Sequence, residues 1–265
     1  MQDSALNELF ESHLSSFREY SEKTFHGQEM EDIHQLRVSI KKIRSLLDLF
    51  IKTFKTNIRK KEYYSLLKEI FQSAGKVREI QINKELILEH DRAAVKSYFE
   101  YLQRSQRYYG KKLVMKIENF NSKEFESKTE AITEEIKKYD NNEILFKSTN
   151  YLEKNLNKLY GLVSEKDLKL HKIRKVIRTF NEVHKIISKI DPDNKYENIN
   201  KDLKDKRGEL GNWHDHIVLI RSVESYIQRN KPKKDLTKLQ RVLKKLIEMN
   251  EQRTRDISKE LRKLL

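Results

Sequence analysis

Apolar residues recur at helical spacing along almost the whole chain. In the segment 33–50, Leu, Ile and Phe return every three or four positions, which places them on one face of a helix. Only six glycines and two prolines occur in 265 residues, and strands need turns that use those residues. The sequence therefore predicts an all-α fold. Helices are expected over approximately 3–25, 29–54, 58–89, 91–119, 123–139, 143–163, 166–190, 195–229 and 234–264.

Composition excludes several classes of site. The chain has no cysteine, so disulfides, thiolate metal sites and a cysteine nucleophile are ruled out. Its eight histidines include no pair at the i, i+4 spacing of helical metal sites, and we expect neither a metal nor a cofactor. The longest apolar runs, such as LLDLFI, are far shorter than the roughly 18–20 residues that cross a bilayer. The start of the chain does not read as a signal peptide, and we expect a cytoplasmic protein without membrane insertion.

The charge balance predicts an anionic partner. Lys and Arg number 56 against 41 Asp and Glu, a formal net charge of +15. Such an excess attracts nucleic acid, anionic membrane surfaces or polyphosphates. Charge alone does not choose among them, and no residue pattern specifies an oligomeric state.

Two segments of the chain repeat the same basic pattern. HQLRVSIK begins at residue 34 and HKIRKVIR at residue 171. In each, a histidine is followed by a basic residue three positions later and by another seven positions later. These residues are His34, Arg37 and Lys41 in the first segment and His171, Arg174 and Arg178 in the second.

The two segments begin 137 residues apart, and two further patterns recur at offsets of 136 and 148 residues. A glycine motif, AGKVRE at 74–79 and LGNWHD at 210–215, follows each histidine segment by some 40 residues. In the last helix of each half, a polar or basic residue is followed by basic residues three and seven positions later. The matched positions are Gly75, Arg78 and Glu79 with Gly211, His214 and Asp215, and Arg104, Arg107 and Lys111 with Gln252, Arg255 and Lys259.

The repeats predict an internal duplication. We expect two pseudo-symmetric four-helix bundles, residues 1–120 and 142–265, joined by a connector helix over 121–141. On a helix, offsets of 0, 3, 7 and 10 fall within an arc of roughly 80°. His34, Arg37, Lys41 and Arg44 therefore form one stripe beside the apolar face, with Lys42 and Lys175 at the margins. A basic row in that position can line a groove where two bundles meet.

These motifs resemble the conserved histidine α-helical domain, or CHAD. The resemblance rests on H-x-x-R-x-x-x-[KR] followed some 40 residues later by a glycine motif, both occurring twice, and it covers nearly the whole chain. It implies two four-helix bundles around a basic central cavity or pore, which binds inorganic polyphosphate without catalysis. It also implies an association with polyphosphate granules. The implied binding residues are His34, Arg37, Lys41, Lys42, Arg44, Arg78, Arg104, Arg107, Lys111, His171, Arg174, Lys175, Arg178, His214, Arg255 and Lys259.

The second half departs from the pattern. Asn181 occupies the position that corresponds to Arg44, His214 replaces an arginine, and Gln252 replaces a basic residue. Glu79 and Ala74 are departures in the first half. We therefore expect the first half to carry more of the ligand contact.

Several alternatives stay open at this stage. Each basic row on its own could be a solvated helix face, and His34 and His171 could be core histidines bonded to a neighbouring helix. His214 and Asp215 suggest acid–base catalysis, but adjacent residues diverge by about 100° on a helix, and a non-enzymatic protein is expected. The main functional alternative is sequence-nonspecific binding of nucleic acid.

Overall fold

The computed structural model describes residues 4–27, 29–230 and 234–264, and within them the chain is all-helical, without a strand. The helices are α1 (Ala5–His26), α2 (Met30–Thr53), α3 (Lys60–Ile87), α4 (Arg92–Glu118), α5 (Ser122–Ile136), α6 (Asn141–Val163), α7 (Leu170–Ile190), α8 (Glu197–Arg229) and α9 (Lys234–Leu264). Each predicted segment corresponds to one of them, with ends that differ by a few residues. In the described part of the chain, no helix combines the length and apolarity needed to cross a bilayer.

Side-chain caps fix where several helices begin. The carboxylates of Asp91 and Asp140 accept hydrogen bonds from the backbone amides of Ala93 (2.9 Å) and Glu143 (2.8 Å). Asn121 caps α5 in the same way. These bonds satisfy amides that lack a partner in the first turn of a helix, and they set the start of α4, α5 and α6.

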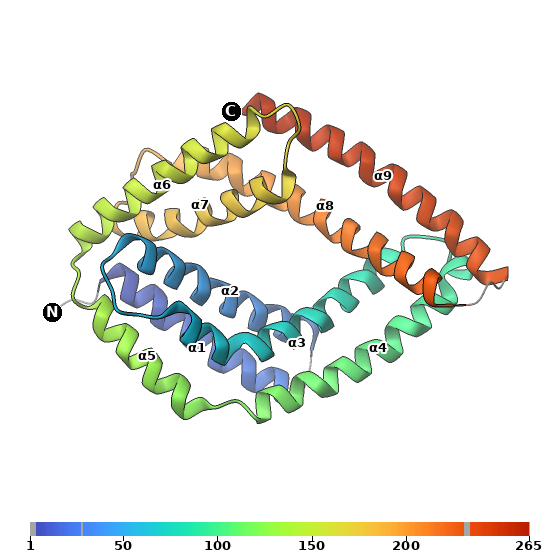
Figure 1. Ribbon diagram of the computed structural model, residues 1–265, viewed down its shortest axis with the longest axis horizontal. Helices are drawn as coiled ribbons and strands as arrows, with labels where there is room; N and C mark the ends of the chain where they lie inside the picture. Colours follow the sequence, from blue (N-terminus) through green and yellow to red (C-terminus); the bar gives the residue numbers. More distant parts are fainter. Residues whose placement is uncertain (1–3, 28, 231–233, 265) are drawn as a thin grey trace.

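The helices form an elongated ring (Figure 1). Consecutive helices pack in pairs, α1 with α2, α3 with α4, α6 with α7 and α8 with α9. The first four helices contact the last four through α3 with α8 and α4 with α9 at one end, and through α1 and α2 with α6 and α7 at the other. Helices α2, α3, α7 and α8 lie on the inner side of the ring, and α4, α5, α6 and α9 follow its outline (Figure 1). The inner helices therefore carry the residues that surround the middle of the molecule.

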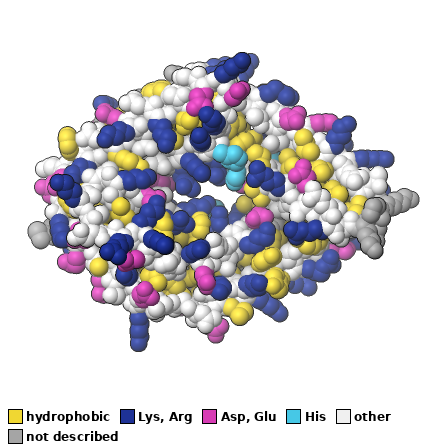
Figure 2. Space-filling model, in the orientation of Figure 1, with side chains coloured by type: hydrophobic (Ala, Val, Ile, Leu, Met, Phe, Trp, Pro, Cys, Tyr) yellow, Lys and Arg dark blue, Asp and Glu magenta, His cyan; other side chains and the backbone are white. Residues whose placement is uncertain are grey.

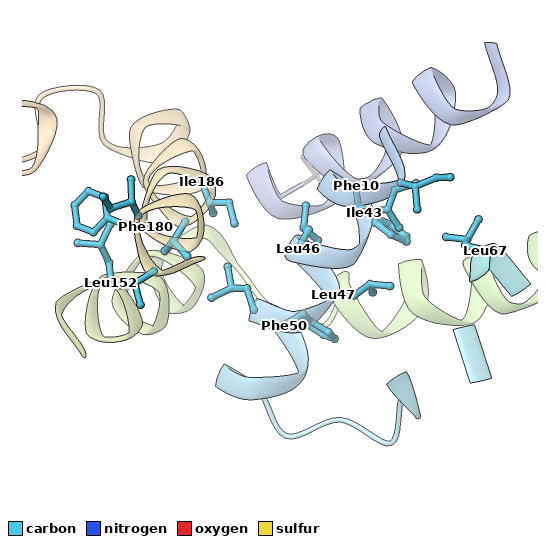
Figure 3. Packing of buried hydrophobic residues seen from close by; sticks show 14 of the residues in the cluster. Phe10, Ile43, Leu46, Leu47, Phe50, Leu67, Leu152, Phe180 and Ile186 are labelled. Carbon is cyan, nitrogen blue, oxygen red and sulfur yellow. The ribbon is translucent and has the colours of Figure 1, made fainter. Parts of the chain in front are cut away.

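The core explains why the inner helices present a basic face. The larger apolar cluster buries residues such as Phe10, Phe50 and Phe180 completely, and Figure 3 shows α2 and α7 sharing it through side chains that include Leu46 and Ile186. A second cluster at the other end of the ring packs α3, α4, α8 and α9 around Tyr98. Because the apolar stripes of the inner helices face these clusters, the adjoining basic stripes are left to face the middle of the ring.

The space-filling view shows an opening in the middle of the molecule (Figure 2). Dark blue Lys and Arg side chains lie around much of its wall, with cyan histidines at one edge (Figure 2). Acidic side chains are scattered over the visible face, but few of them border the opening.

Candidate functional site

The histidine segments of the two halves meet because α2 packs beside α7. Lys41 of α2 lies within the field of Arg174 and Arg178 of α7, and Arg178 also lies near Arg44. Helices α3 and α8 add further cations beside them. We call this group the central basic cluster. It consists of Arg37, Lys41, Arg44, Arg78, Arg174, Arg178 and Arg207.

Aromatic side chains of α3 hold two of these arginines in place. The Arg37 guanidinium lies 4.9 Å from the ring centre of Phe71. Arg44 lies 4.5 Å from the ring centre of Tyr64 and 5.0 Å from that of Phe71. The Tyr64 hydroxyl in turn donates a 2.6 Å hydrogen bond to the carbonyl of Arg44. Cation–π contact fixes the plane of a guanidinium and leaves the N–H groups at its edge available to an anion.

Gly75 makes room for Arg37. A Cβ added at position 75 would overlap Nη1 of Arg37 and lie 3.3 Å from its Cζ. The glycine motif of the first half therefore serves close approach of a side chain rather than of another helix. Gly211, the matched position in α8, has nothing within 4 Å of an added Cβ, so no comparable close approach occurs there.

Gly75→Ala and Gly211→Ala form a matched pair of variants. Both remove a glycine from inside a helix, which should stabilise each protein by up to about 1 kcal/mol. Only Gly75→Ala displaces Arg37, so it alone should weaken anion binding, by roughly tenfold, the value of one charge-assisted hydrogen bond. Titration with polyphosphate and urea unfolding of both variants measure the two effects. Equal affinities for the two variants would contradict the role given to Gly75.

The two candidate histidines are not core residues. His34 is half-buried and His171 is exposed, whereas the buried histidines of the described chain are His184 and His216. The ring of His171 packs 4.8 Å from Trp213 and 5.2 Å from His214, centre to centre. The core-histidine alternative therefore does not apply to His34 or His171.

Trp213 links α8 to α9 next to His171. It is 6% exposed, and its indole N–H donates a 2.9 Å hydrogen bond to Oγ1 of Thr254 on α9. Trp213 thus joins α8 to α9 and supports the ring of His171 beside it.

The second half replaces its missing arginine from another helix. Asn181, at the position that matches Arg44, is 1% exposed and donates a 2.9 Å hydrogen bond to the side chain of Asn200. Arg207 of α8 instead lies near Arg174 and Arg178. In the first half the position four residues before the motif glycine is Phe71, and in the second it is Arg207. The arginine is therefore on α2 in the first half and on α8 in the second, and Arg207 offsets the expected shortfall of the second half.

Sequence comparison missed two basic residues of α8. Besides Arg207, Arg221 lies near both His171 and His214. Residues 207, 214 and 221 are spaced by seven, so they lie on one helix face. The sequence positions seven residues before and after His214, two helical turns away on the same face, would have identified both arginines.

Of the seven cations in the cluster, Arg207 alone forms an ion pair among the described residues, with Glu182 at 3.5 Å. Asp215 lies near Arg174, Arg78 and Lys41, but no cation of the described chain comes within 4 Å of its carboxylate. The Asp215 carboxylate therefore accepts no hydrogen bond from these basic side chains. Glu79 instead pairs with Lys76 at 2.9 Å. The Nε atoms of Arg78 and Arg178 and the Nδ1 of His214 are buried without a partner among the described residues.

Burial, together with neighbouring cations, lowers the pKa values of Lys41 and of several arginines and histidines at the site. Burial, reinforced by Arg37, Arg178 and Arg174, lowers the pKa of Lys41 from 10.5 to about 7. Burial and Arg174 lower the pKa of His214 to about 4, and the pKa values of His34 and His171 are lowered for similar reasons. These pKa values are lowered because burial and neighbouring positive charges, with no anion bound, make the charged forms less stable. A bound polyanion would reverse these shifts.

The structure leaves other predicted residues outside the cluster. Arg104, Arg107 and Lys111 are exposed on α4, and Arg255 and Lys259 are exposed on α9. None of these five lies among the charges that act on the cluster side chains. Lys175 is exposed at the margin, and Lys42 lines a small cavity with His13, Glu182 and Lys185.

Comparisons with known proteins agree with the fold. The family model of the CHAD domain matches residues 8–161. The crystal structure of the CHAD domain from the plant Ricinus communis resembles this chain with a TM-score of 0.76 at 15% sequence identity, over 99% of this chain and 92% of that one. No curated protein matches the sequence.

Proposed function

The chain belongs to the CHAD family, and from that premise we propose that it binds inorganic polyphosphate through the central basic cluster and catalyses no reaction. The observation that carries the proposal is the convergence of half-buried cations from α2, α3, α7 and α8 at the middle of the ring. Because six of the seven cations form no ion pair among the described residues, the exception being Arg207 with Glu182, an external anion is the natural counter-charge.

The geometry suits a flexible chain of phosphates. Basic residues one turn apart on α2, Arg37, Lys41 and Arg44, face those of α7, so successive phosphates can be held from both sides. Arginine forks bind phosphate oxygens in pairs, and histidine can donate a hydrogen bond and gain a proton beside a polyanion. Binding would release counterions from the polyanion.

One observation favours polyphosphate over single-stranded nucleic acid. Nucleic-acid channels without sequence preference offer exposed aromatic rings on which bases stack. In the cluster, Phe71 and Tyr64 are already covered by Arg37 and Arg44. A base would have no free ring there, whereas a phosphate needs none.

We expect binding to weaken steeply with salt. A ligand that contacts about six cations should give a slope near −4 in a plot of log K against log salt concentration, as for single-stranded polyanions. In competition at equal phosphate concentration, polyphosphate should displace single-stranded DNA or RNA, and the reverse displacement should be weak. A slope near zero would contradict electrostatic binding, and displacement of polyphosphate by nucleic acid would favour the alternative ligand.

The proposal extends to location. A protein of this kind would act in the cytoplasm and gather at polyphosphate granules. Co-localisation of the tagged full chain with stained granules, lost when Arg37, Lys41 and Arg44 are replaced, tests that extension.

A further inference from the structure

A small cavity lies where the two halves meet, beside the central basic cluster. It has a volume of about 60 Å³ and is lined by residues of α1, α2, α6 and α7. Only Arg178 belongs both to this cavity and to the central basic cluster. The charged side chains that line the cavity are Lys42, Asp48, Lys52, Arg178, Glu182 and Lys185.

The size of the cavity limits its ligand to a single small ion. A water molecule needs roughly 10–15 Å³ of such space, so the cavity has room for about five groups of that size. An orthophosphate ion, a phosphorus atom with its four oxygens, fills that space. A nucleotide or a chain of phosphates is several times larger.

Both acids in the wall are already paired with cations. Glu182 binds Lys185 of its own helix at 3.0 Å and Arg207 of α8 at 3.5 Å. Asp48 pairs with Lys60 of α3. Because Arg207 and Lys60 reach these acids from outside the cavity, the acids do not balance the cations that line it, and the cavity favours an anion.

Two cations and two neutral groups remain to bind that anion. Lys42 forms no ion pair among the described residues, and the Nε of Arg178 is buried without a hydrogen-bond partner among them. The Tyr151 hydroxyl accepts a 3.4 Å hydrogen bond from Lys52, so its own proton can be donated to a ligand. Burial, with nearby Lys42, lowers the pKa of His13 to about 4, and a neutral imidazole donates one N–H.

Glu182 makes the cavity selective for an anion that carries a proton. Its side chain is 14% exposed, and a carboxylate can only accept hydrogen bonds. Orthophosphate at neutral pH keeps at least one proton, which it can donate to Glu182 while its other oxygens accept from Lys42 and Arg178. Sulfate has the same shape but no proton, so the carboxylate would repel it.

We propose that this cavity is a binding site for inorganic phosphate, in which Lys42 and Arg178 hold the anion and Glu182 accepts its proton. A phosphate bound there would engage Arg178 and so remove one cation from the central basic cluster. That consequence rests on the proposed function, whereas the phosphate site itself does not.

Titration of the full-length protein with sodium phosphate at pH 7, against sodium sulfate at matched ionic strength, is the test. We expect one phosphate per chain and at least about tenfold weaker binding of sulfate. Lys42→Gln should weaken phosphate binding by at least about tenfold, the value of one charge-assisted hydrogen bond. Glu182→Gln should bind the two anions about equally. Lys175→Gln is the control, because Lys175 is exposed on α7 and should bind like the wild type.

A second variant separates this site from the polyphosphate site. Replacing Arg37, Lys41 and Arg44 by alanine leaves the proposed ligands of phosphate in place, so this variant should keep phosphate binding. Its loss there, or wild-type binding by both Lys42→Gln and Glu182→Gln, would overturn the phosphate site. Phosphate binding with the expected preference, in a protein that fails to bind polyphosphate, would uphold the phosphate site and contradict only the proposed function.

Discussion

Replacing Arg37, Lys41 and Arg44 together by alanine is expected to weaken polyphosphate binding by at least about 100-fold while the helical content stays the same. Charge-assisted hydrogen bonds contribute about 1.5–3 kcal/mol each, and the loss of three should exceed 3 kcal/mol even when they are not additive. All three side chains lie outside the apolar core, and alanine is the best helix former. Isothermal titration with polyphosphate and circular dichroism measure the two quantities.

The matched control removes the same charge from another helix. Arg104, Arg107 and Lys111 also lie on one helix face over a span of seven residues, but they are exposed on α4. Their replacement by alanine should change the affinity by no more than a few-fold through the loss of net charge. If the α4 variant lost binding and the α2 variant kept it, the site would lie on the outer surface of the ring.

The second prediction with a large expected effect concerns the stability of the protein when Lys41 is replaced. Lys41→Met should raise the free energy of unfolding of the ligand-free protein by about 1–4 kcal/mol, the range seen when buried ionic groups are replaced by apolar residues. The cause is the lowered pKa of Lys41, about 7 in the folded protein and near 10.4 in an unfolded chain. The same substitution should weaken polyphosphate binding, because it removes a cation from the cluster.

The pH dependence of this effect has a definite sign. Between about pH 7 and pH 10.4 the unfolded chain binds the Lys41 proton more readily than the folded protein does, so this lysine makes the wild-type stability rise with pH. The cost of the lysine is greatest below pH 7 and vanishes above about pH 10.4. The advantage of Lys41→Met should therefore be larger at pH 6 than at pH 9.5.

Urea unfolding of both proteins at the two pH values measures that difference. Lys175→Met is the control, because Lys175 is exposed and its replacement should leave the stability nearly unchanged at both pH values. A Lys41→Met variant that is less stable than the wild type, or equally stabilised at pH 6 and 9.5, would show that the charge of Lys41 does not destabilise the folded protein.

The sequence predicts the helices and the α2 row well because both depend on spacing within one helix. An apolar residue every three or four positions allows only one periodic structure. The same geometry places Arg37, Lys41 and Arg44 on one face of the helix, independently of how the helix packs against the others. Their recurrence at Arg174 and Arg178 marked the partner helix, and the packing of α2 beside α7 brings the two rows together.

The remaining parts of the site depend on contacts between helices. Whether a row on α4 faces inward or outward depends on how the helix rolls against α3 and α9, and spacing does not determine that. Arg207 escaped notice for a different reason. A search for repeats compares matching positions of the two halves. The corresponding arginine is Arg44 on α2 in the first half but Arg207 on α8 in the second, so the two do not align. Only the three-dimensional neighbourhood shows that the two arrangements supply the same charge.

A crystal structure of the protein with a short-chain polyphosphate tests the central claim most directly. We predict phosphate density in the opening of the ring, within hydrogen-bond distance of Arg37 and Lys41 on α2 and of Arg174 and Arg178 on α7. Arg207 should contact it from α8. Density found only along the exposed rows of α4 and α9, with the central basic cluster empty at saturating ligand, would contradict it.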